Sequence, residues 1–229
     1  MEIKRSTAPA VTAGEELSTT LEHYQDKPTL LLLSGGSALS ILDYVSNVVL
    51  GPKLTITTLD ERFSTDLNIN NFAQIKATEF YERARGHGAS EIDTSISSDD
   101  SLQETGQRFE ASLQDWREKH PDGIMIATMG VGADGHTAGI FPNQPSFDYE
   151  SDNWVVAHEL TSGANPYAKR ITVTLLFLKT QVTHAIGYII SEEKRSVFDS
   201  LQNDSFSLKE LPACILKEMA SVVVITDLY

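Results

Sequence analysis

The sequence is poor in cysteine and has no long apolar segment. Its 229 residues include one cysteine, Cys214, so no disulfide can form within the chain, which fits a reducing compartment. No apolar run approaches the roughly 18 to 20 residues that a helix needs to cross a bilayer. The amino-terminal segment MEIKRSTAPA lacks the apolar centre of a signal peptide. We therefore expect a cytoplasmic protein with no membrane partner.

Basic residues are also scarce. The chain has 18 lysine and arginine residues against 32 aspartate and glutamate residues, which gives a formal net charge of -14. Binding to DNA or RNA needs a clustered basic surface, and the sequence contains no such cluster. We therefore expect no nucleic-acid partner. An anionic small molecule remains compatible with this charge if a few local cations and backbone N–H groups capture it.

The six histidines do not follow a metal-binding pattern. None has the HxxxH or His-Cys spacing of a metal site, so we predict no metal. His184 is expected to begin a strand. The segment GVGADG differs from the GxGxxG fingerprint of nucleotide-binding proteins, so we predict no nucleotide cofactor. Four other histidines are expected in surface or turn positions: His23, His87, His120 and His158.

Apolar segments of strand length alternate with segments of helical periodicity along the whole chain. This alternation predicts one α/β domain, residues 1–229, with a mainly parallel sheet and right-handed crossovers. Strands are predicted at residues 29–33, 54–59, 124–127, 155–156, 170–174, 184–190 and 221–226. Helices are predicted at residues 12–23, 39–49, 71–85 and 101–119, after residue 194, and around residues 215–216. Loops are predicted at residues 86–100, 143–153 and 161–169.

The segment TMGVGADGHTAGIFP, residues 128–142, follows a strand that is predicted to be buried on both faces. Its glycines allow the backbone to approach a ligand closely. Asp134 and His136 lie in this turn, ahead of a short helix predicted at residues 136–141. Because ligands bind at the carboxyl ends of parallel strands, we expect reactive side chains here. A glycine-rich turn with one histidine is also common in proteins without catalysis, so the other segments matter.

Other polar segments are predicted at the same edge of the sheet. The segment SGGS, residues 34–37, connects a strand to a helix, an arrangement that points free N–H groups at an anion. The segment DER, residues 60–62, either positions a polar substrate or forms a solvated loop with a local ion pair. Lys194 is predicted in the first turn of a helix, where a cation is disfavoured unless an anion lies nearby or the side chain points outward into solvent. Arg170 begins a predicted strand.

The order and spacing of SGGS, DER, GVGADGHTAGIFP, RITVT and Lys194 resemble those of the 6-phosphogluconolactonases, which share a sugar-phosphate superfamily with glucosamine-6-phosphate deaminases. The resemblance covers nearly the whole chain, and the DGHTA…FP block is its specific part. It implies a Rossmann-like α/β fold with a mainly parallel sheet and helices on both faces. It also implies hydrolysis of 6-phospho-D-glucono-1,5-lactone to 6-phosphogluconate in the oxidative pentose phosphate pathway, without a metal or organic cofactor.

The resemblance also implies roles for individual residues. His136, Asp134 and Asp60 would face the reacting end of the sugar. Because an imidazole can act as base and then as acid near neutral pH, we hypothesise that His136 activates water and that Asp134 or Asp60 orients the imidazole or the water. Backbone N–H groups around Gly135 are expected to stabilise the oxyanion. The substrate and its phosphate would be bound by Ser34, Gly35, Gly36, Ser37, Arg62, Arg170 and Lys194.

The sequence departs from the family pattern at several positions. Ala38 and Leu39 replace the usual Thr-Pro after SGGS, and Ser191 replaces the usual glycine before Glu-Glu-Lys. Deaminases typically read DGHIAFNEP, with a glutamate at the position where this chain has Phe141. A deaminase-isomerase and a catalytically inactive sugar-phosphate-binding relative are therefore the two alternatives to a lactonase. The sequence predicts no oligomeric state.

Overall fold

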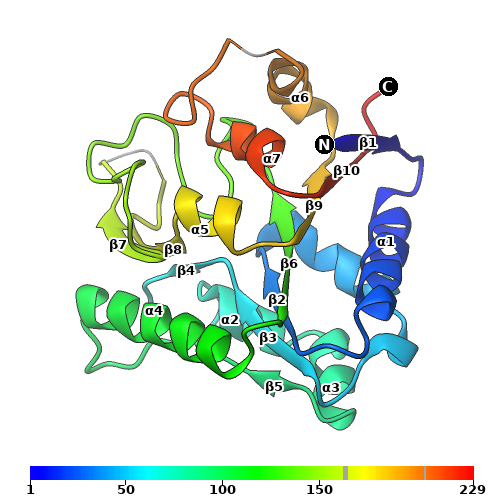
Figure 1. Cartoon of the computed structure of the whole chain (residues 1–229). Helices are drawn as coiled ribbons and strands as arrows, with labels where there is room; N and C mark the ends of the chain where they lie inside the picture. Colours follow the sequence, from blue (N-terminus) through cyan, green and yellow to red (C-terminus); the bar gives the residue numbers. More distant parts are fainter. Residues whose placement is uncertain (162–164, 204) are drawn as a thin grey trace.

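The computed structural model describes residues 1–161, 165–203 and 205–229, which form two sheets with helices packed around them (Figure 1). In the larger, seven-stranded sheet every strand pairing is parallel. Its strands are, in spatial order, β1 (Glu2–Arg5), β10 (Val222–Thr226), β9 (His184–Ile189), β6 (Ile124–Gly130), β2 (Thr29–Leu33), β3 (Leu54–Thr58) and β5 (Ser90–Glu91). The predicted parallel sheet is confirmed, although β1 and β5 were not predicted.

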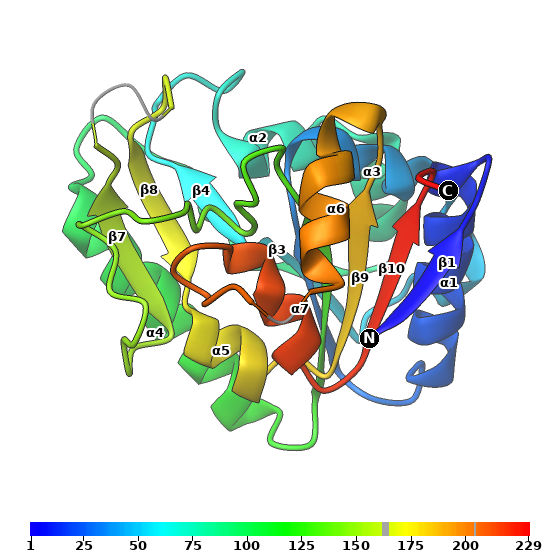
Figure 2. The ribbon, with the colours of Figure 1, turned by 90° about the horizontal axis from the view of Figure 1, so that it is seen from above.

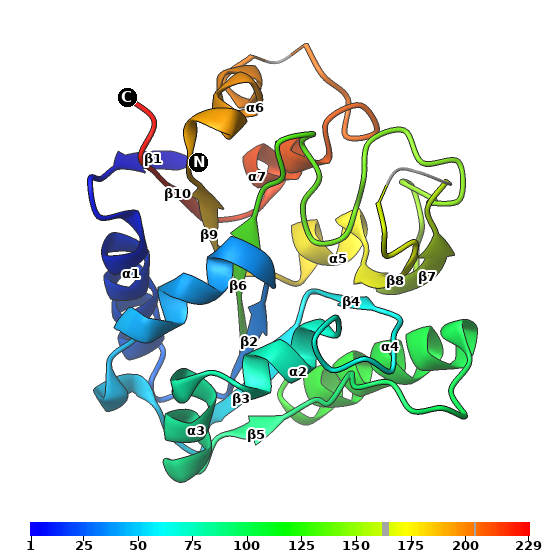
Figure 3. The same ribbon diagram turned by 180° about the vertical axis from the view of Figure 1, so that it is seen from behind.

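Helices cover both faces of this sheet, with α1 to its right and α5 and α7 to its left in Figure 1; Figure 3 shows the same two layers from behind. Strand β2 shows why both layers form, because Leu30 and Leu32 belong to one apolar cluster while Leu31 and Leu33 belong to the other. The predicted α/β fold class is confirmed. One layer contains α1 (Pro9–His23), the 3-10 helices η1 (Gly36–Tyr44) and η2 (Asn47–Val49), α2 (Asn71–Lys76) and α3 (Glu79–Gly86). The other contains α4 (Leu102–Lys119), α5 (Leu175–Thr180), η3 (Glu192–Lys194) leading into α6 (Arg195–Leu201), and η4 (Pro212–Cys214) leading into α7 (Ile215–Glu218).

A second sheet, which is antiparallel, carries two of the predicted site segments. Its strands are, in spatial order, β4 (Asp60–Arg62), β8 (Lys169–Val173) and β7 (Val155–Glu159). Only Leu59 separates β4 from β3, so the chain passes from one sheet to the other at that residue. Figure 2 shows this sheet set apart from β9 and β10. The strand predicted at residues 170–174 is confirmed, but it belongs to this separate sheet, which the sequence did not predict.

The helix predicted at residues 39–49 has a different form. These residues belong to the two 3-10 helices η1 and η2, with extended backbone between them. Arg83 of α3 donates hydrogen bonds to the carbonyls of Leu42 and Val45. These side-chain bonds satisfy acceptors at the end of η1, so a continuing α-helix is not needed there.

The remaining long helices agree more closely with the sequence. The helix predicted at residues 71–85 is divided into α2 and α3, because Thr78 caps the start of α3 through its side chain. The helix predicted at residues 101–119 is confirmed as α4, and Ser101 is its N-cap. In the described parts of the chain, no helix combines the length and the apolar character of a membrane span.

His158 lies in the interior, and its predicted surface or turn position is wrong. It belongs to β7, is only 4% exposed, and packs against the Phe147 ring with the two ring planes 71° apart. Burial, and then the charge of Arg170, lower the pKa of His158 to about 4. The sequence could not predict this burial, because the side chains that cover His158 come from other segments. His184, by contrast, begins β9 as predicted.

We expect His158 to make the stability of the protein pH-dependent. A histidine in an unfolded chain titrates near pH 6.5, whereas the folded protein keeps His158 neutral down to about pH 4. Because the folded pKa is the lower one, the stabilisation is complete above about pH 6.5 and is lost as the pH falls toward 4. Relative to His158→Leu, the free energy of unfolding of the wild type should fall by up to about 3 kcal/mol over this range.

Urea unfolding at a series of pH values measures this difference. The matched control is His87→Leu, because His87 is an exposed histidine, and its curve should run parallel to that of the wild type. Parallel curves for the wild type and His158→Leu would contradict the expectation.

Candidate active site

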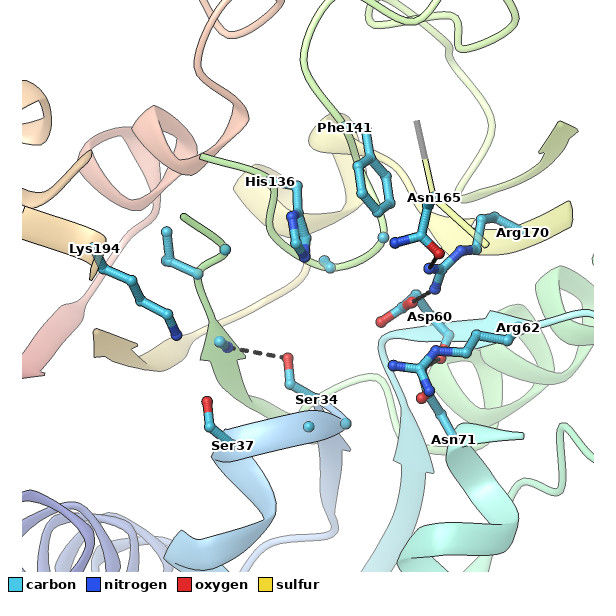
Figure 4. Close-up of a pocket in the computed structure, with 17 residues that line it drawn as sticks. Ser34, Ser37, Asp60, Arg62, Asn71, His136, Phe141, Asn165, Arg170 and Lys194 are labelled. Carbon is cyan, nitrogen blue, oxygen red and sulfur yellow. Dashed lines mark hydrogen bonds and ion pairs between the residues drawn. The ribbon is translucent and has the colours of Figure 1, made fainter. Parts of the chain in front are cut away.

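A pocket of about 280 Å³ lies where the carboxyl ends of β2, β6 and β9 meet the second sheet. Every predicted site residue except Asp134 lines this pocket, and Figure 4 shows their side chains around it. Of the loop predicted at residues 161–169, residues 162–164 lie outside the described residues. The lining also includes residues with no predicted role: Asn71, Gly130, Val131, Gly132, Ala138, Gly139, Phe141 and Asn165.

The turn after β6 folds back on itself, and the short helix predicted from His136 is wrong. Gly132 N–H donates to the His136 carbonyl at 2.9 Å, and Gly135 N–H donates to the Gly132 carbonyl at 3.0 Å. Ala138 and Gly139 both have left-handed backbone, with φ of 48° and 71°. A right-handed helix cannot pass through two such residues. The resulting turn presents the imidazole to the pocket.

Asp134 and His136 form a carboxylate–imidazole pair. Nδ1 of His136 lies 2.5 Å from Oδ1 of Asp134, and the His136 backbone N–H donates to the same oxygen at 3.1 Å. Burial acts to raise the pKa of Asp134, but the hydrogen bonds and charge of His136 outweigh it and hold that pKa below its ordinary value. With Nδ1–H donating to the carboxylate, Nε2 is the acceptor of a neutral imidazole. Among the described residues, no three His, Cys, Asp or Glu side chains gather into a possible metal site.

Asp60 and Arg170 form a buried ion pair between β4 and β8. Nη1 of Arg170 lies 3.2 Å from Oδ2 of Asp60, and the two side chains are 4% and 9% exposed, respectively. Arg170 also donates from Nε to the Tyr167 carbonyl at 3.0 Å and from Nη2 to Oδ1 of Asn165 at 3.2 Å. Each nitrogen of this guanidinium therefore has a partner within the protein.

Glu61 lies behind the pocket and is fully buried. Its carboxylate accepts from the backbone N–H groups of Arg62, Asn71 and Phe72 and from the Thr94 hydroxyl, at 2.5 to 3.0 Å. Burial raises the pKa of Glu61 to about 7, although the backbone hydrogen bonds act to lower it. The donors of Asn71 and Phe72 tie β4 to the start of α2, and so fix the side chains that β4 presents to the pocket.

Lys194 is a buried cation with no hydrogen-bond or ion-pair partner among the residues that the structure describes. It is 8% exposed, at the junction of η3 and α6. Burial lowers its pKa, although the charges of Glu193 and Asp227 oppose the change. Figure 4 shows its side chain reaching toward Ser37. An unpaired buried charge is costly, so this ammonium group favours a bound anion.

The pocket has two different ends. Lys194 and the SGGS segment form one end, Arg170 and Asp60 form the other, and His136 lies between them (Figure 4). The sequence grouped Arg170 with Lys194 at one anion site, whereas the structure keeps these two cations apart. The predicted role of Arg170 in phosphate binding stays a prediction, and its observed partner is Asp60.

Ser191 stands where the family pattern has glycine, and a hydrogen bond stabilises its unusual backbone conformation. Ser191 has φ of 79° and ψ of 147°, in a region that glycine adopts far more easily than other residues. This conformation explains why glycine is usual at that position. The Ser191 N–H donates to Oδ1 of Asp227 at 2.9 Å, which holds the strained turn ahead of Lys194.

Three further residues had no role assigned from the sequence. Asn71 donates to the backbone of β4, Asn165 accepts from Arg170, and the ring of Phe141 stacks on that of His136. Of the three, only Phe141 could have been singled out from the sequence, because it belongs to the DGHTA…FP block. The contacts of the two asparagines join segments that are separated in the sequence.

The parallel sheet and the pocket at its carboxyl edge define a Rossmann-like α/β protein with a candidate active site. The chain belongs to the glucosamine-6-phosphate isomerase/6-phosphogluconolactonase family, whose model matches residues 5–225. The family predicted from the sequence motifs is therefore confirmed.

Two solved structures support the fold over nearly the whole chain. A 6-phosphogluconolactonase from Shewanella baltica has a TM-score of 0.78 and 18% identity, covering 98% of this chain and 96% of that one. A 6-phosphogluconolactonase from Trypanosoma brucei has a TM-score of 0.77 and 18% identity, covering 98% and 95%.

Curated relatives match over shorter segments. A probable 6-phosphogluconolactonase of Dictyostelium discoideum is 26% identical over 112 residues, which is 49% of this chain and 46% of the relative. A 6-phosphogluconolactonase of Chlamydia trachomatis is 30% identical over 96 residues, which is 42% of this chain and 34% of the relative. The chain thus spans less than half the length of the curated relatives in these matches.

Proposed function

We propose that the protein hydrolyses 6-phospho-D-glucono-1,5-lactone to 6-phosphogluconate, a step of the oxidative pentose phosphate pathway. The observation that carries the proposal is that Lys194, whose ammonium has no partner among the described residues, lines the same pocket as His136, whose imidazole is paired with Asp134. One group suits the phosphate, and the other suits a carbonyl that reacts with water. Membership of the family supports the same substrate class. We further propose that residues 1–229 act as one sugar-phosphate-binding domain.

In the proposed reaction, Nε2 of His136 takes a proton from water as the water oxygen bonds to the lactone carbonyl carbon. Asp134 holds the opposite ring nitrogen and stabilises the imidazolium that forms. The bond between the carbonyl carbon and the ring oxygen then breaks, and the imidazolium returns its proton to that oxygen. The product is the open-chain acid, which ionises in water.

We propose a different oxyanion donor from the N–H groups expected around Gly135. The N–H groups of Gly132 and Gly135 already donate within the turn. The guanidinium of Arg62 lines the end of the pocket that contains Asp60, and it lies over the Tyr167 ring. We assign the developing negative charge to Arg62, because a guanidinium that is already in place needs no rearrangement during the reaction.

At the other end, Lys194 and the SGGS segment take the phosphate. Gly36 leaves that end of the pocket open, because a Cβ there would meet no atom within 4 Å, whereas a Cβ at Gly35 would meet the Asn71 side chain. The hydroxyl of Ser37 and the backbone of the segment supply donors beside the charge of Lys194. His136 then faces the opposite end of the same sugar.

The test compares freshly prepared 6-phosphogluconolactone with glucono-1,5-lactone, each corrected for spontaneous hydrolysis. We expect kcat/KM to be at least about 10-fold higher for the phosphorylated lactone, the value of one charge-assisted contact. Equal values would refute the phosphate site. Ammonia release from glucosamine 6-phosphate would identify a deaminase instead, and tight binding without turnover would identify an inactive relative.

We expect a methyl group at Gly132 to disable catalysis without unfolding the protein. A Cβ there would lie 2.1 Å from Cε1 and Nδ1 of His136, so the ring would have to move. The His136 side chain is 35% exposed and has room to swing outward. Gly132→Ala should lower kcat by about 10²-fold, because an ångström of misplacement has that effect.

Steady-state kinetics and thermal unfolding check this expectation. Gly51→Ala is the control, because no atom lies within 4 Å of a Cβ at that position. An unchanged kcat in Gly132→Ala would contradict the assigned position of the imidazole.

A further inference from the structure

Phe141 lies between the catalytic imidazole and the buried guanidinium. Its ring centroid is 4.4 Å from that of His136 with the planes 17° apart, and Cζ of Arg170 lies 5.3 Å from the same ring centroid. Figure 4 shows Phe141 between the two side chains. The residue is 3% exposed, and its carbonyl accepts a hydrogen bond from the Tyr149 hydroxyl. Burial and this backbone hydrogen bond hold Phe141 in place, with its ring against both His136 and Arg170.

We propose that Phe141 is a positioning residue for His136, one that fixes the plane of the imidazole and stabilises its protonated form. This inference rests on the proposed lactonase function and deepens it. It assigns Phe141 a role beyond that of an apolar core side chain.

The first part of the argument is geometric. The bond from Nδ1 to Asp134 holds one edge of the imidazole but leaves rotation about the direction of that bond. The His136 side chain is 35% exposed, and Gly132 beside the ring has no Cβ that could hold it in place. A nearly parallel ring on one face removes this rotation. Nε2 then keeps a constant direction toward the pocket, as proton transfer from the attacking water to Nε2 requires.

The second part is electrostatic. When His136 takes a proton, the resulting imidazolium lies against the electron-rich face of Phe141, which attracts cations. The same ring keeps the imidazolium at a distance from Arg170, and the charge of Arg170 is offset by its ion pair with Asp60. Phe141 therefore acts in the step that forms the cation rather than in substrate binding. The charged groups that face His136 across the pocket are Asp60, Arg62, Arg170 and Lys194.

The experiment compares Phe141→Leu with Phe141→Tyr. Leucine keeps an apolar side chain but removes the aromatic face, whereas tyrosine keeps the face. We expect kcat of Phe141→Leu to fall about tenfold, with KM within about twofold of the wild type because the phosphate contacts are untouched. Phe141→Tyr should retain kcat within about threefold.

The matched control is Phe80→Leu. Phe80 is a fully buried phenylalanine of α3 that does not line the pocket. It should lose stability as Phe141→Leu does, yet keep kcat. Equal losses of kcat in Phe141→Leu and Phe80→Leu would overturn the proposal, as would an unchanged kcat in Phe141→Leu.

A second readout does not depend on turnover. A ring stacked at this distance shifts the carbon-bound imidazole protons of His136 upfield in the NMR spectrum, and we expect Phe141→Leu to abolish this shift while Phe141→Tyr keeps it. Unshifted imidazole protons in the wild type would overturn the inference. If the wild type shows the shift but no lactonase activity, the proposed function fails, and the proposed effect of Phe141 on catalysis fails with it, while the stacking itself is upheld.

Discussion

Replacing His136 with glutamine should lower kcat by about 10²- to 10⁴-fold, the usual contribution of a positioned base. Glutamine keeps a polar side chain of similar reach, but it cannot take a proton from water near neutral pH. KM should change little, because Lys194 and the SGGS segment remain in place. The measurement is the initial rate on freshly prepared phosphorylated lactone after subtraction of the enzyme-free rate.

Asp134→Asn provides the graded comparison for this variant. The asparagine side chain can still contact Nδ1, but it has no charge to stabilise the imidazolium, so we expect a kcat between those of the wild type and His136→Gln. Full lactonase activity in His136→Gln would contradict the role of the imidazole as the base. Full activity in Asp134→Asn alone would contradict only the role of the carboxylate that orients it.

Replacing Lys194 with methionine should lower kcat/KM for the phosphorylated lactone by about 10- to 100-fold, because a charge-assisted contact with the phosphate is lost. Turnover of glucono-1,5-lactone should be nearly unchanged, since that molecule has no group for the ammonium to bind. The ratio of the two kcat/KM values therefore isolates the phosphate contact from the chemistry. An unchanged ratio would show that the anion binds elsewhere.

The same variant should be at least as stable as the wild type in the absence of substrate. Lys194 is 8% exposed and has no ion-pair partner among the described residues, so methionine removes a buried charge and keeps the volume. Thermal unfolding without and with 6-phosphogluconate tests this. Only the wild type should gain stability from the ligand. Lys169→Met is the control, because Lys169 is exposed and does not line the pocket.

The sequence was sufficient to predict the strands whose side chains are buried on both faces of the parallel sheet. The four consecutive leucines of β2 predict a strand inside a parallel sheet, and the structure confirms it. The short strand β5, by contrast, has two residues, SE, and forms only because β3 lies beside it. The second sheet was missed for a similar reason, because DER has no strand pattern of its own and pairs with β8 through its backbone.

The candidate site was predictable where a residue type alone restricts the chemistry. An imidazole two residues from a carboxylate predicts acid–base chemistry, and a lysine at the start of a helix predicts an anion site. The pocket contains both His136 and Lys194. The role of Glu61 depends on Asn71, Phe72 and Thr94. Such contacts join distant segments, so no local pattern could reveal them. The separation of Arg170 from Lys194 has the same origin, since it follows from the existence of two sheets.

The direct passage from β3 into β4 makes this part of the chain intolerant of changes in length. Side chains alternate along a strand, so Asp60 and Arg62 face the pocket while Glu61 faces the four donors behind it. Deleting or inserting one residue at Leu59 would exchange these faces, turning an arginine toward N–H donors and a lone carboxylate toward the substrate. Conservative substitutions at Leu59 should be tolerated in this protein, whereas single-residue insertions there should abolish both folding of the second sheet and activity.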